Sequence, residues 1–237
     1  MRLITWNCQG AFRNKVDLII SHHPDILVVQ ECEHPDKYIF SSTTKKPTFY
    51  YWYGDNINKG ICIFSYSNYK FELLPIFNPE FKYILPFRVT GPNHSFNLFA
   101  IWAMNNKENY DARYIGQIWL AINYYIDLLD TSIILIGDFN SNKIWDYNGR
   151  IGNHSDVVRK LSEHKIQSIY HQHFHLEQGQ EKHPTFFLQR YLNKPYHIDY
   201  CFASADILDK VQKVEIGIYD KWIAYSDHSP LFIDFDL

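Results

Sequence analysis

The chain is short of basic residues, of paired cysteines and of long apolar runs. Its 23 Lys and Arg residues are outnumbered by 26 Asp and Glu residues, so the formal net charge is −3. A protein that binds nucleic acid mainly through its overall electric field carries a basic surplus instead. Any anionic substrate must therefore be held by local cations or by a metal ion.

The four cysteines are scattered, and none forms a CxxC pair. This spacing indicates neither a zinc knuckle nor a disulfide framework. The longest apolar runs, 26–29 and 133–136, fall far short of the roughly 18 residues that cross a membrane. A chemistry-bearing segment already begins at Leu3, so we expect no signal peptide. These features predict a cytoplasmic protein without membrane contact.

Aromatic residues, by contrast, are abundant. The chain of 237 residues holds 18 Tyr, 17 Phe and 6 Trp, which carry large areas to bury. Short apolar runs alternate with amphipathic stretches from end to end, without a low-complexity linker or an evident repeat. We therefore expect one continuous α/β domain over residues 1–237.

The apolar spacing places the main elements along the chain. Residues 14–22 have helical spacing up to Pro24, and 26–29 have the pattern of a buried strand. The longest helix is expected over 111–129, with Asp111 as its N-cap. Further strands are expected within 60–74 around a turn at 67–68, and at 96–103, 133–136, 197–203, 214–218 and 230–235, with helices capped by Ser155 and Ser204. This order predicts stacked sheets with helices outside.

Polar residues recur at the ends of strands that otherwise have core composition. Asn7 ends the run 3–6, Glu31 ends the run from Ile26, and Asp138 and Asn140 follow 133–136. A lone carboxylate buried in such a place is costly unless it is paired or bound to a metal. Each residue alone could equally cap a turn or form an ion pair. Together, at the carboxyl ends of strands, they predict one site.

Five short motifs carry a family resemblance. They are Trp-Asn at 6–7, Gln-Glu at 30–31, Gly-Asp-Phe-Asn at 137–140, Ile-Asp-Tyr at 198–200 and Ser-Asp-His-Ser-Pro at 226–230. In this order they resemble the successive motifs of the endonuclease/exonuclease/phosphatase superfamily, over nearly the whole chain. The resemblance implies a DNase I-like four-layer α/β sandwich, in which two mainly antiparallel sheets pack face to face with helices outside. It also implies hydrolysis of phosphodiesters.

The resemblance implies a metal site and a hydrolytic site. Glu31 would be the main ligand for Mg²⁺, with Mn²⁺ as a substitute, because Mg²⁺ prefers carboxylate and water. Asn7 would lie beside Glu31, and Asp227 would complete or back the metal sphere. Asp138 would orient or deprotonate the attacking water, while Asn140 would hydrogen-bond either the phosphate or Asp138.

The resemblance also assigns a charged dyad. His228 matches the family's phosphate-contacting histidine, and Asp199 matches the carboxylate that fixes its tautomer and favours its protonated form. Arg113 lies near the place of a phosphate-binding arginine, although a solvated first turn of a helix is an equal alternative.

The chain departs from the family pattern at two positions. Trp102 stands where relatives have a Tyr or a His, and an indole cannot act as an acid or base. We therefore expect Trp102 to contact substrate at most. Gln9 stands where some relatives carry an acidic metal ligand, which favours a site with a single metal ion.

The segment 182–197 interleaves cations with aromatic residues and favours a nucleic acid substrate, DNA or RNA. Arg190 and Lys194 are its candidate phosphate contacts. Three functions stay open: a nuclease, a phosphatase or phosphodiesterase for a small or lipid phosphate, and an inactive binding module. The complete set of acid, amide and histidine residues disfavours the last. The small chain would also suit an accessory nuclease recruited by a protein partner.

Overall fold

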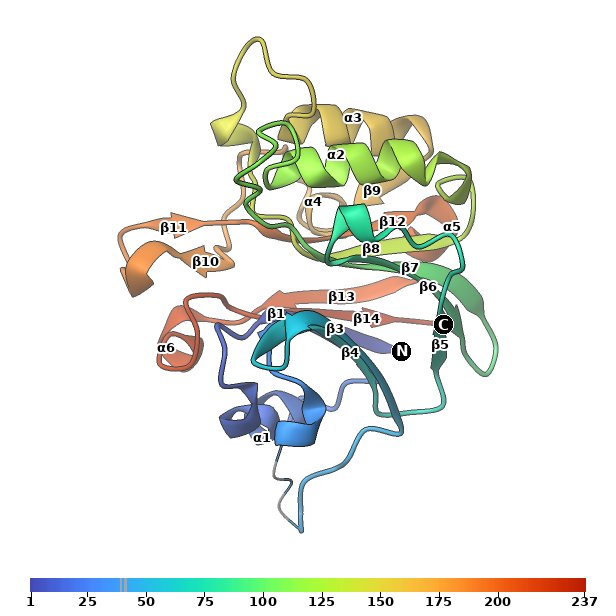
Figure 1. Cartoon of the computed structure of the whole chain (residues 1–237), viewed down its shortest axis with the longest axis vertical. Helices are drawn as coiled ribbons and strands as arrows, with labels where there is room; N and C mark the ends of the chain where they lie inside the picture. The colour runs from blue at the N-terminus through green and yellow to red at the C-terminus, as the bar shows by residue number, and fades with distance from the viewer. Residues whose placement is uncertain (39, 41) are drawn as a thin grey trace.

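Two six-stranded sheets pack face to face in the computed structural model, which describes residues 1–38, 40 and 42–237 (Figure 1). The first sheet has the order β13-β14-β1-β2-β4-β3 and the second β5-β6-β7-β8-β12-β9. The strands of the first sheet are β13 (Val211–Ile216), β14 (Leu231–Phe235), β1 (Arg2–Asn7), β2 (Ile26–Cys32), β4 (Lys59–Ser65) and β3 (Phe49–Asn56). Those of the second are β5 (Lys70–Leu73), β6 (Ile84–Thr90), β7 (Ser95–Trp102), β8 (Ile133–Asp138), β12 (Asp199–Ser204) and β9 (Ile166–Ser168).

Each sheet contains one parallel pair among antiparallel neighbours. β1 runs parallel to β2, and β7 runs parallel to β8. All the other pairs in the two sheets are antiparallel. Within each parallel pair the two carboxyl ends lie at the same edge of the sheet. Asn7, Trp102 and Asp138 are the last residues of their strands, so this pairing brings the polar side chains of Asn7 and Asp138 to these edges.

Helices cover the outer face of each sheet, which gives four layers and confirms the predicted fold class. α1 (Val16–Ile20) and α6 (Tyr219–Trp222) share a core with the first sheet, and α2 (Ile115–Tyr124) and α3 (His154–Glu163) share one with the second. A third core between the sheets contains residues of both, such as Val28 and Ile136. The shorter elements are α4 (Ile169–Phe174), α5 (Ala205–Leu208) and the 3₁₀ turns Phe12–Asn14, Pro35–Lys37, Pro79–Phe81, Ile126–Leu128, Lys143–Trp145 and Leu188–Arg190.

The long helix expected over 111–129 is shorter than predicted. It begins at Ile115, because the preceding Tyr114 has a positive φ of 49°, and Asp111 lies in the turn before it. Regular helix stops at Tyr124 and a 3₁₀ turn follows. Residues 103–114 therefore form the loop between β7 and α2.

Two other boundaries differ from the sequence prediction. α3 is capped by Asn153 rather than Ser155, through a capping box with Asp156 that the sequence pattern did not single out. The strands expected within 60–74 exist, but β4 and β5 belong to different sheets. The turn between them therefore carries the chain from one sheet to the other.

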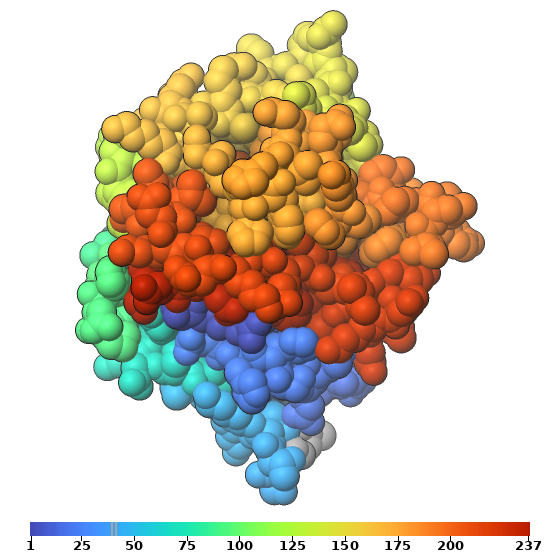
Figure 2. All heavy atoms as spheres, turned by 180° about the vertical axis from the view of Figure 1, so that it is seen from behind, coloured from blue at the N-terminus to red at the C-terminus, as the bar shows by residue number. Residues whose placement is uncertain are grey.

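Among the residues that the structure describes, no helix is long and apolar enough to cross a membrane. All four cysteines are buried free thiols. A small hairpin, β10 (Phe186–Phe187) and β11 (Pro195–Tyr196), forms a separate two-stranded sheet that is bridged to His228. This hairpin projects from the body of the molecule in both views (Figure 1, Figure 2).

Candidate active site

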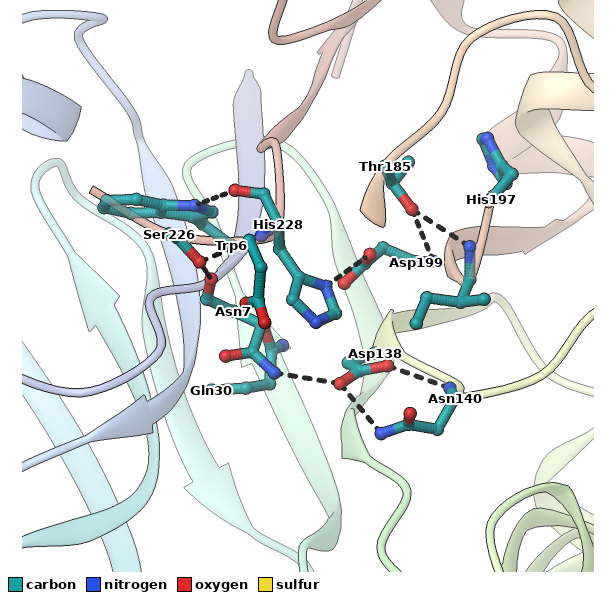
Figure 3. A network of polar contacts seen from close by, with 12 residues as sticks. Trp6, Asn7, Gln30, Asp138, Asn140, Thr185, His197, Asp199, Ser226 and His228 are labelled. Atoms are coloured by element: carbon teal, nitrogen blue, oxygen red, sulfur yellow. Dashed lines mark hydrogen bonds and ion pairs between the residues drawn. The ribbon is translucent and has the colours of Figure 1, made fainter. Parts of the chain in front are cut away.

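The edges of the two sheets meet at a cluster of polar side chains (Figure 3). Asn7, at the end of β1, donates from one amide nitrogen to Asp138 Oδ2 at 2.9 Å and to Glu31 Oε1 at 3.3 Å. Three strands of the two sheets therefore contribute to one cluster. The predicted convergence of these strand ends is seen directly in this shared amide.

A bulge in β2 sets the direction of Glu31. The pairing of β2 with β4 shifts between Gln30 and Cys32, and Glu31 has a positive φ of 63°. A bulge of this kind leaves one residue out of the ladder and redirects its side chain. Gln30 and Cys32 are fully buried, whereas the side chain of Glu31 keeps 22% exposure. The carboxylate therefore reaches the open edge of the cluster.

Asp138 lies at the centre and is fully buried. Its oxygens accept hydrogen bonds from Asn7 Nδ2, from the backbone N of Asn140 at 2.8 Å and from Asn140 Nδ2 at 3.1 Å. Burial, and after it the charge of Asp199, raises the pKa of Asp138 to about 7. A carboxylate with this pKa can both hold and accept a proton near neutral pH.

Asn140 supports Asp138 in this structure. Its side chain donates to Asp138 Oδ2 and to the carbonyl of Ala103 at 3.0 Å, and its φ of 48° lies in the left-handed region that asparagine tolerates. Of the two contacts expected for Asn140, the one to Asp138 is therefore present.

His228 and Asp199 form a buried ion pair above Asp138. His228 Nδ1 lies 2.9 Å from Asp199 Oδ2, and the two residues are 6% and 1% exposed. Burial alone would lower the pKa of His228, but the charge and hydrogen bond of Asp199, with the charge of Asp138, raise it to about 10. The ring is therefore charged at neutral pH, and its second nitrogen faces Asp138 (Figure 3).

Antiparallel pairing explains how these distant segments meet. Asp199, the first residue of β12, is the register partner of Asp138 at the end of β8. β14 begins at Leu231 opposite Thr5 of β1, so the preceding His228 lies beside the end of β1. The dyad and the cluster below it are thus set by strand register.

Three residues to which the sequence motifs assign no role hold this geometry. Trp6 Nε1 donates to the carbonyl of His228 at 2.9 Å. Ser226 Oγ donates to the carbonyl of Asn7 at 2.7 Å and accepts the backbone N–H of His228 at 3.0 Å. Thr185 Oγ1 accepts the backbone N–H of Asp199 at 3.0 Å. Ser226 and Trp6 lie within the recognised motifs, but Thr185 lacks a local sequence signal.

A second buried network lies behind the cluster. Asn142 donates to the carbonyl of His197 at 2.9 Å, to Tyr200 Oη at 3.1 Å and to Glu181 Oε2 at 3.1 Å. Burial would raise the pKa of Glu181, but hydrogen bonds from His171, Gly179 and Asn142 lower it to about 2. Asn142 therefore ties the loop after β8 to the chain that enters β12.

Two groups of side chains, with no residue in common, are candidates for holding a metal ion. Asp138, Asp199 and His228 offer ligand atoms that all lie within 4.8 Å of one another. A protonated imidazole has no lone pair for a metal, however, and His228 already pairs with Asp199. The carboxylates of Glu31 and Asp227, with the amide oxygen of Asn7, are the donors that a hard divalent cation prefers. Burial raises the pKa of Asp227, the charge of His228 lowers it, and the charge of Glu31 adds to the rise.

Lys59 is a site residue that the sequence did not reveal. Its ammonium lies 2.8 Å from Glu31 Oε2 and 5.4 Å from the centre of the Trp102 ring. It comes from the start of β4 and reaches Glu31 only through strand pairing. Trp102 itself is 3% exposed and packs on Tyr83, so it forms the floor of this region rather than its surface.

The predicted substrate-binding cations are placed differently. Arg190 lies over the site edge, where its Nε donates to Gln9 Oε1 at 3.2 Å, and Gln9 in turn donates to Asp227 at 2.7 Å. Lys194 faces outward, with its ammonium 5.1 Å from the Tyr191 ring. The structure does not bring Arg113 into the cluster, because its guanidinium donates to the carbonyl of Asn106 at 2.6 Å within loop 103–114.

Comparison with known proteins agrees with this architecture. The model of the Endonuclease/Exonuclease/phosphatase family matches residues 4–228. The 3′ phosphatase NExo from Neisseria, solved with a product DNA hairpin, is similar in fold at 18% identity, with 100% of each chain covered and a TM-score of 0.72. An AP endonuclease from Archaeoglobus fulgidus is similar at 17% identity, again with 100% of each chain covered and a TM-score of 0.70. The endonuclease domain of TRAS1, a telomere-specific non-LTR retrotransposon, has 16% identity and a TM-score of 0.66, with 99% of this chain and 97% of the other covered. Curated protein sequences give no match.

Proposed function

Because this chain belongs to the endonuclease/exonuclease/phosphatase family, we propose that it is a Mg²⁺-dependent nuclease that hydrolyses phosphodiester bonds of DNA or RNA. The observation that carries this proposal is the arrangement of three groups. Asp138 is a buried carboxylate with a raised pKa, His228 is a buried cation facing it, and Asn7 joins Asp138 to Glu31. Such a set can activate water and stabilise charge on a phosphoryl group at one place.

Asp138 accepts the proton of the attacking water. Its pKa of about 7 matches a general base that works near neutral pH. Asn7 and Asn140 donate to its oxygens and hold the carboxylate in one orientation. A fixed base avoids the cost of ordering it during the reaction.

His228 stabilises the charge that develops on the phosphoryl oxygens. Asp199 keeps its ring protonated and fixed through Nδ1, so the other ring nitrogen carries a hydrogen toward the site. A preorganised cation in a site of low dielectric is effective at this task. Glu31, Asp227 and Asn7 would hold the divalent cation, which neutralises phosphate charge when bound.

Metal dependence is expected to follow Glu31. Glu31→Gln keeps the shape but removes the charge, so the affinity for Mg²⁺ should fall at least tenfold and turnover should fall with it. Isothermal titration with Mg²⁺ and activity against metal concentration measure the two effects. Asp36→Asn, an exposed carboxylate away from the cluster, is the matched control. Full wild-type activity in EDTA would contradict the proposal.

The class of substrate is tested most directly by comparing candidate substrates side by side. Labelled single- and double-stranded DNA and RNA are incubated with Mg²⁺, Mn²⁺ or EDTA, beside bis(p-nitrophenyl) phosphate. Cleavage of at least one nucleic acid is the expected result. If the enzyme hydrolyses only the small diester, the nuclease proposal is wrong, and the protein is instead a phosphodiesterase for small or lipid phosphates.

The β10–β11 hairpin is expected to contribute to nucleic acid binding. Replacing Arg190 and Lys194 together with Ala should weaken binding of an oligonucleotide severalfold and flatten its salt dependence, because fewer counterions are released. Hydrolysis of bis(p-nitrophenyl) phosphate should change much less. Arg159→Ala with Lys160→Ala removes the same charge from α3 and serves as the control. Equal losses on both substrates would mean that the hairpin only supports the site.

The remaining features of the proposal concern the whole chain. Residues 1–237 act as one domain, which the shared core between the two sheets supports. The four free thiols favour a cytoplasmic location. A protein partner that recruits the enzyme is compatible with its small size.

A further inference from the structure

Aromatic rings lead away from the dyad along the surface of the molecule. The ring of Phe186 lies 4.7 Å from that of His228 and 6.4 Å from that of Tyr196, measured between ring centres. Tyr196 in turn lies 5.0 Å from Trp145 in the loop after β8. The indole of Trp145 is 46% exposed, so this series of rings begins at a buried catalytic group and ends in solvent.

Two more exposed tyrosines lie on the loops that follow β7 and β8. Tyr147 Oη lies 2.6 Å from Tyr110 Oη, which joins loop 139–153 to loop 103–114. These two tyrosines are 44% and 54% exposed. The guanidinium carbons of Arg113 and Arg150 lie 5.0 Å and 5.8 Å from the centre of the Tyr110 ring.

The position of these loops follows from the fold. They leave the carboxyl ends of β7 and β8, where Trp102 and Asp138 are register partners. The amide of Asn140 also donates to Ala103, which ties the starts of the two loops together. In Figure 1 both loops rise from the edge that carries the β10–β11 hairpin. The outer rings and cations therefore extend the active-site edge.

We propose that Trp145, Tyr147, Tyr110, Arg113 and Arg150 form a track for single-stranded nucleic acid that leaves the active site. Bases stack on the exposed rings, and backbone phosphates lie against the two arginines. This proposal rests on the proposed nuclease function and adds the form of the substrate. Arg113, which the structure places away from the cluster, thereby contacts a phosphate that is not cleaved.

The chemistry of the surface favours an unpaired strand. Stacking on aromatic side chains needs the face of a base, which a duplex covers with neighbouring base pairs. Exposed rings beside guanidinium groups are the combination that binds single strands without regard to sequence. The net charge of −3 also means that binding must come from such local features.

The test measures binding without turnover, in an Asp138→Asn background. Trp145→Ala and the pair Tyr110→Ala/Tyr147→Ala are titrated with a fluorescein-labelled oligothymidylate and with a blunt duplex. Loss of one stacked base costs about 1–3 kcal/mol, so each variant should raise the Kd for the single strand about tenfold. The Kd of each variant for the duplex should change less than about twofold, because paired bases cannot stack on these rings.

Two controls separate a binding effect from a change in structure. Tyr124→Ala removes a tyrosine that is 49% exposed at the far end of α2 and should leave binding unchanged. Single-strand binding should also quench tryptophan fluorescence in the parent protein and quench it much less in Trp145→Phe. When the same track substitutions are made in the enzyme that retains Asp138, it should hydrolyse bis(p-nitrophenyl) phosphate at the rate of the unsubstituted enzyme.

The outcomes distinguish the track from the nuclease proposal. If the enzyme cleaves nucleic acid but the track variants bind single strands as tightly as the parent, the proposal of a single-strand track is wrong. The exposed rings would then be a candidate surface for a protein partner. Equal losses on single strand and duplex also overturn the preference for an unpaired strand. If the parent neither binds nor cleaves any nucleic acid, the nuclease function fails, and the track fails with it.

Discussion

Replacing His228 with Ala is expected to lower kcat about 10³-fold, the effect of removing one preorganised donor to developing charge. Asp199→Asn should cause a loss of similar size, because Asp199 holds the ring of His228 through a buried hydrogen bond of 2.9 Å. The two residues act as a unit, so the double variant should be hardly worse than either single variant. Steady-state kinetics on one oligonucleotide and on bis(p-nitrophenyl) phosphate measure this.

The dependence of activity on pH is a second test of the His228–Asp199 pair. The charge of Asp199 raises the pKa of His228, so the residual activity of Asp199→Asn should be lost at lower pH than that of the parent. His164→Ala with Asp130→Asn removes a partly exposed His–Asp pair at 2.7 Å and is the control. Losses that multiply in the double variant would show that His228 and Asp199 work separately.

Asp138→Asn is expected to lower kcat by about 10²–10⁴-fold, the contribution of a positioned general base. The substitution is nearly isosteric, and thermal unfolding should show that the protein still folds. KM should change little, because in the proposed mechanism Asp138 acts on the attacking water rather than on the bound phosphate. If the variant keeps more than about one tenth of the parent kcat, Asp138 is not the general base, because removing a general base costs about 10²-fold or more.

The pH dependence of the parent follows from the two shifted groups. The base must be deprotonated, so activity should fall as the pH drops below the Asp138 pKa of about 7. The cation must be protonated, so activity should also fall as the pH rises above the His228 pKa of about 10. A bell-shaped kcat/KM between these values is expected. Asp138→Asn should lack the acidic limb.

Much of the fold could be predicted because its signals are local. Strands at 96–103, 133–136 and 230–235 appear as β7, β8 and β14 within a few residues. Apolar runs bounded by polar residues mark such strands whatever their neighbours are. The start of the long helix is harder to predict, because Tyr114 before it has a positive φ of 49° that helical spacing does not indicate.

The grouping of the candidate site residues was predictable because local signals also mark where strands end. Asn7, Glu31 and Asp138 stand at strand ends, and the structure joins them through one amide. The sequence motifs could not show that β2 bulges at Glu31, because a bulge is defined by the register with β4. Nor could they show Lys59, which contacts Glu31 from another strand.

The sequence by itself determined which polar residues stand at the ends of which strands. Composition, apolar spacing and short motifs are properties of neighbouring residues, and they are readable without a structure. Tertiary structure alone decided the protonation of His228, the placement of Arg113 outside the cluster, and the contacts of Trp145 with Tyr196 and of Tyr147 with Tyr110. These depend on burial, strand register and loop paths that bring together residues far apart in the chain, which no local pattern encodes.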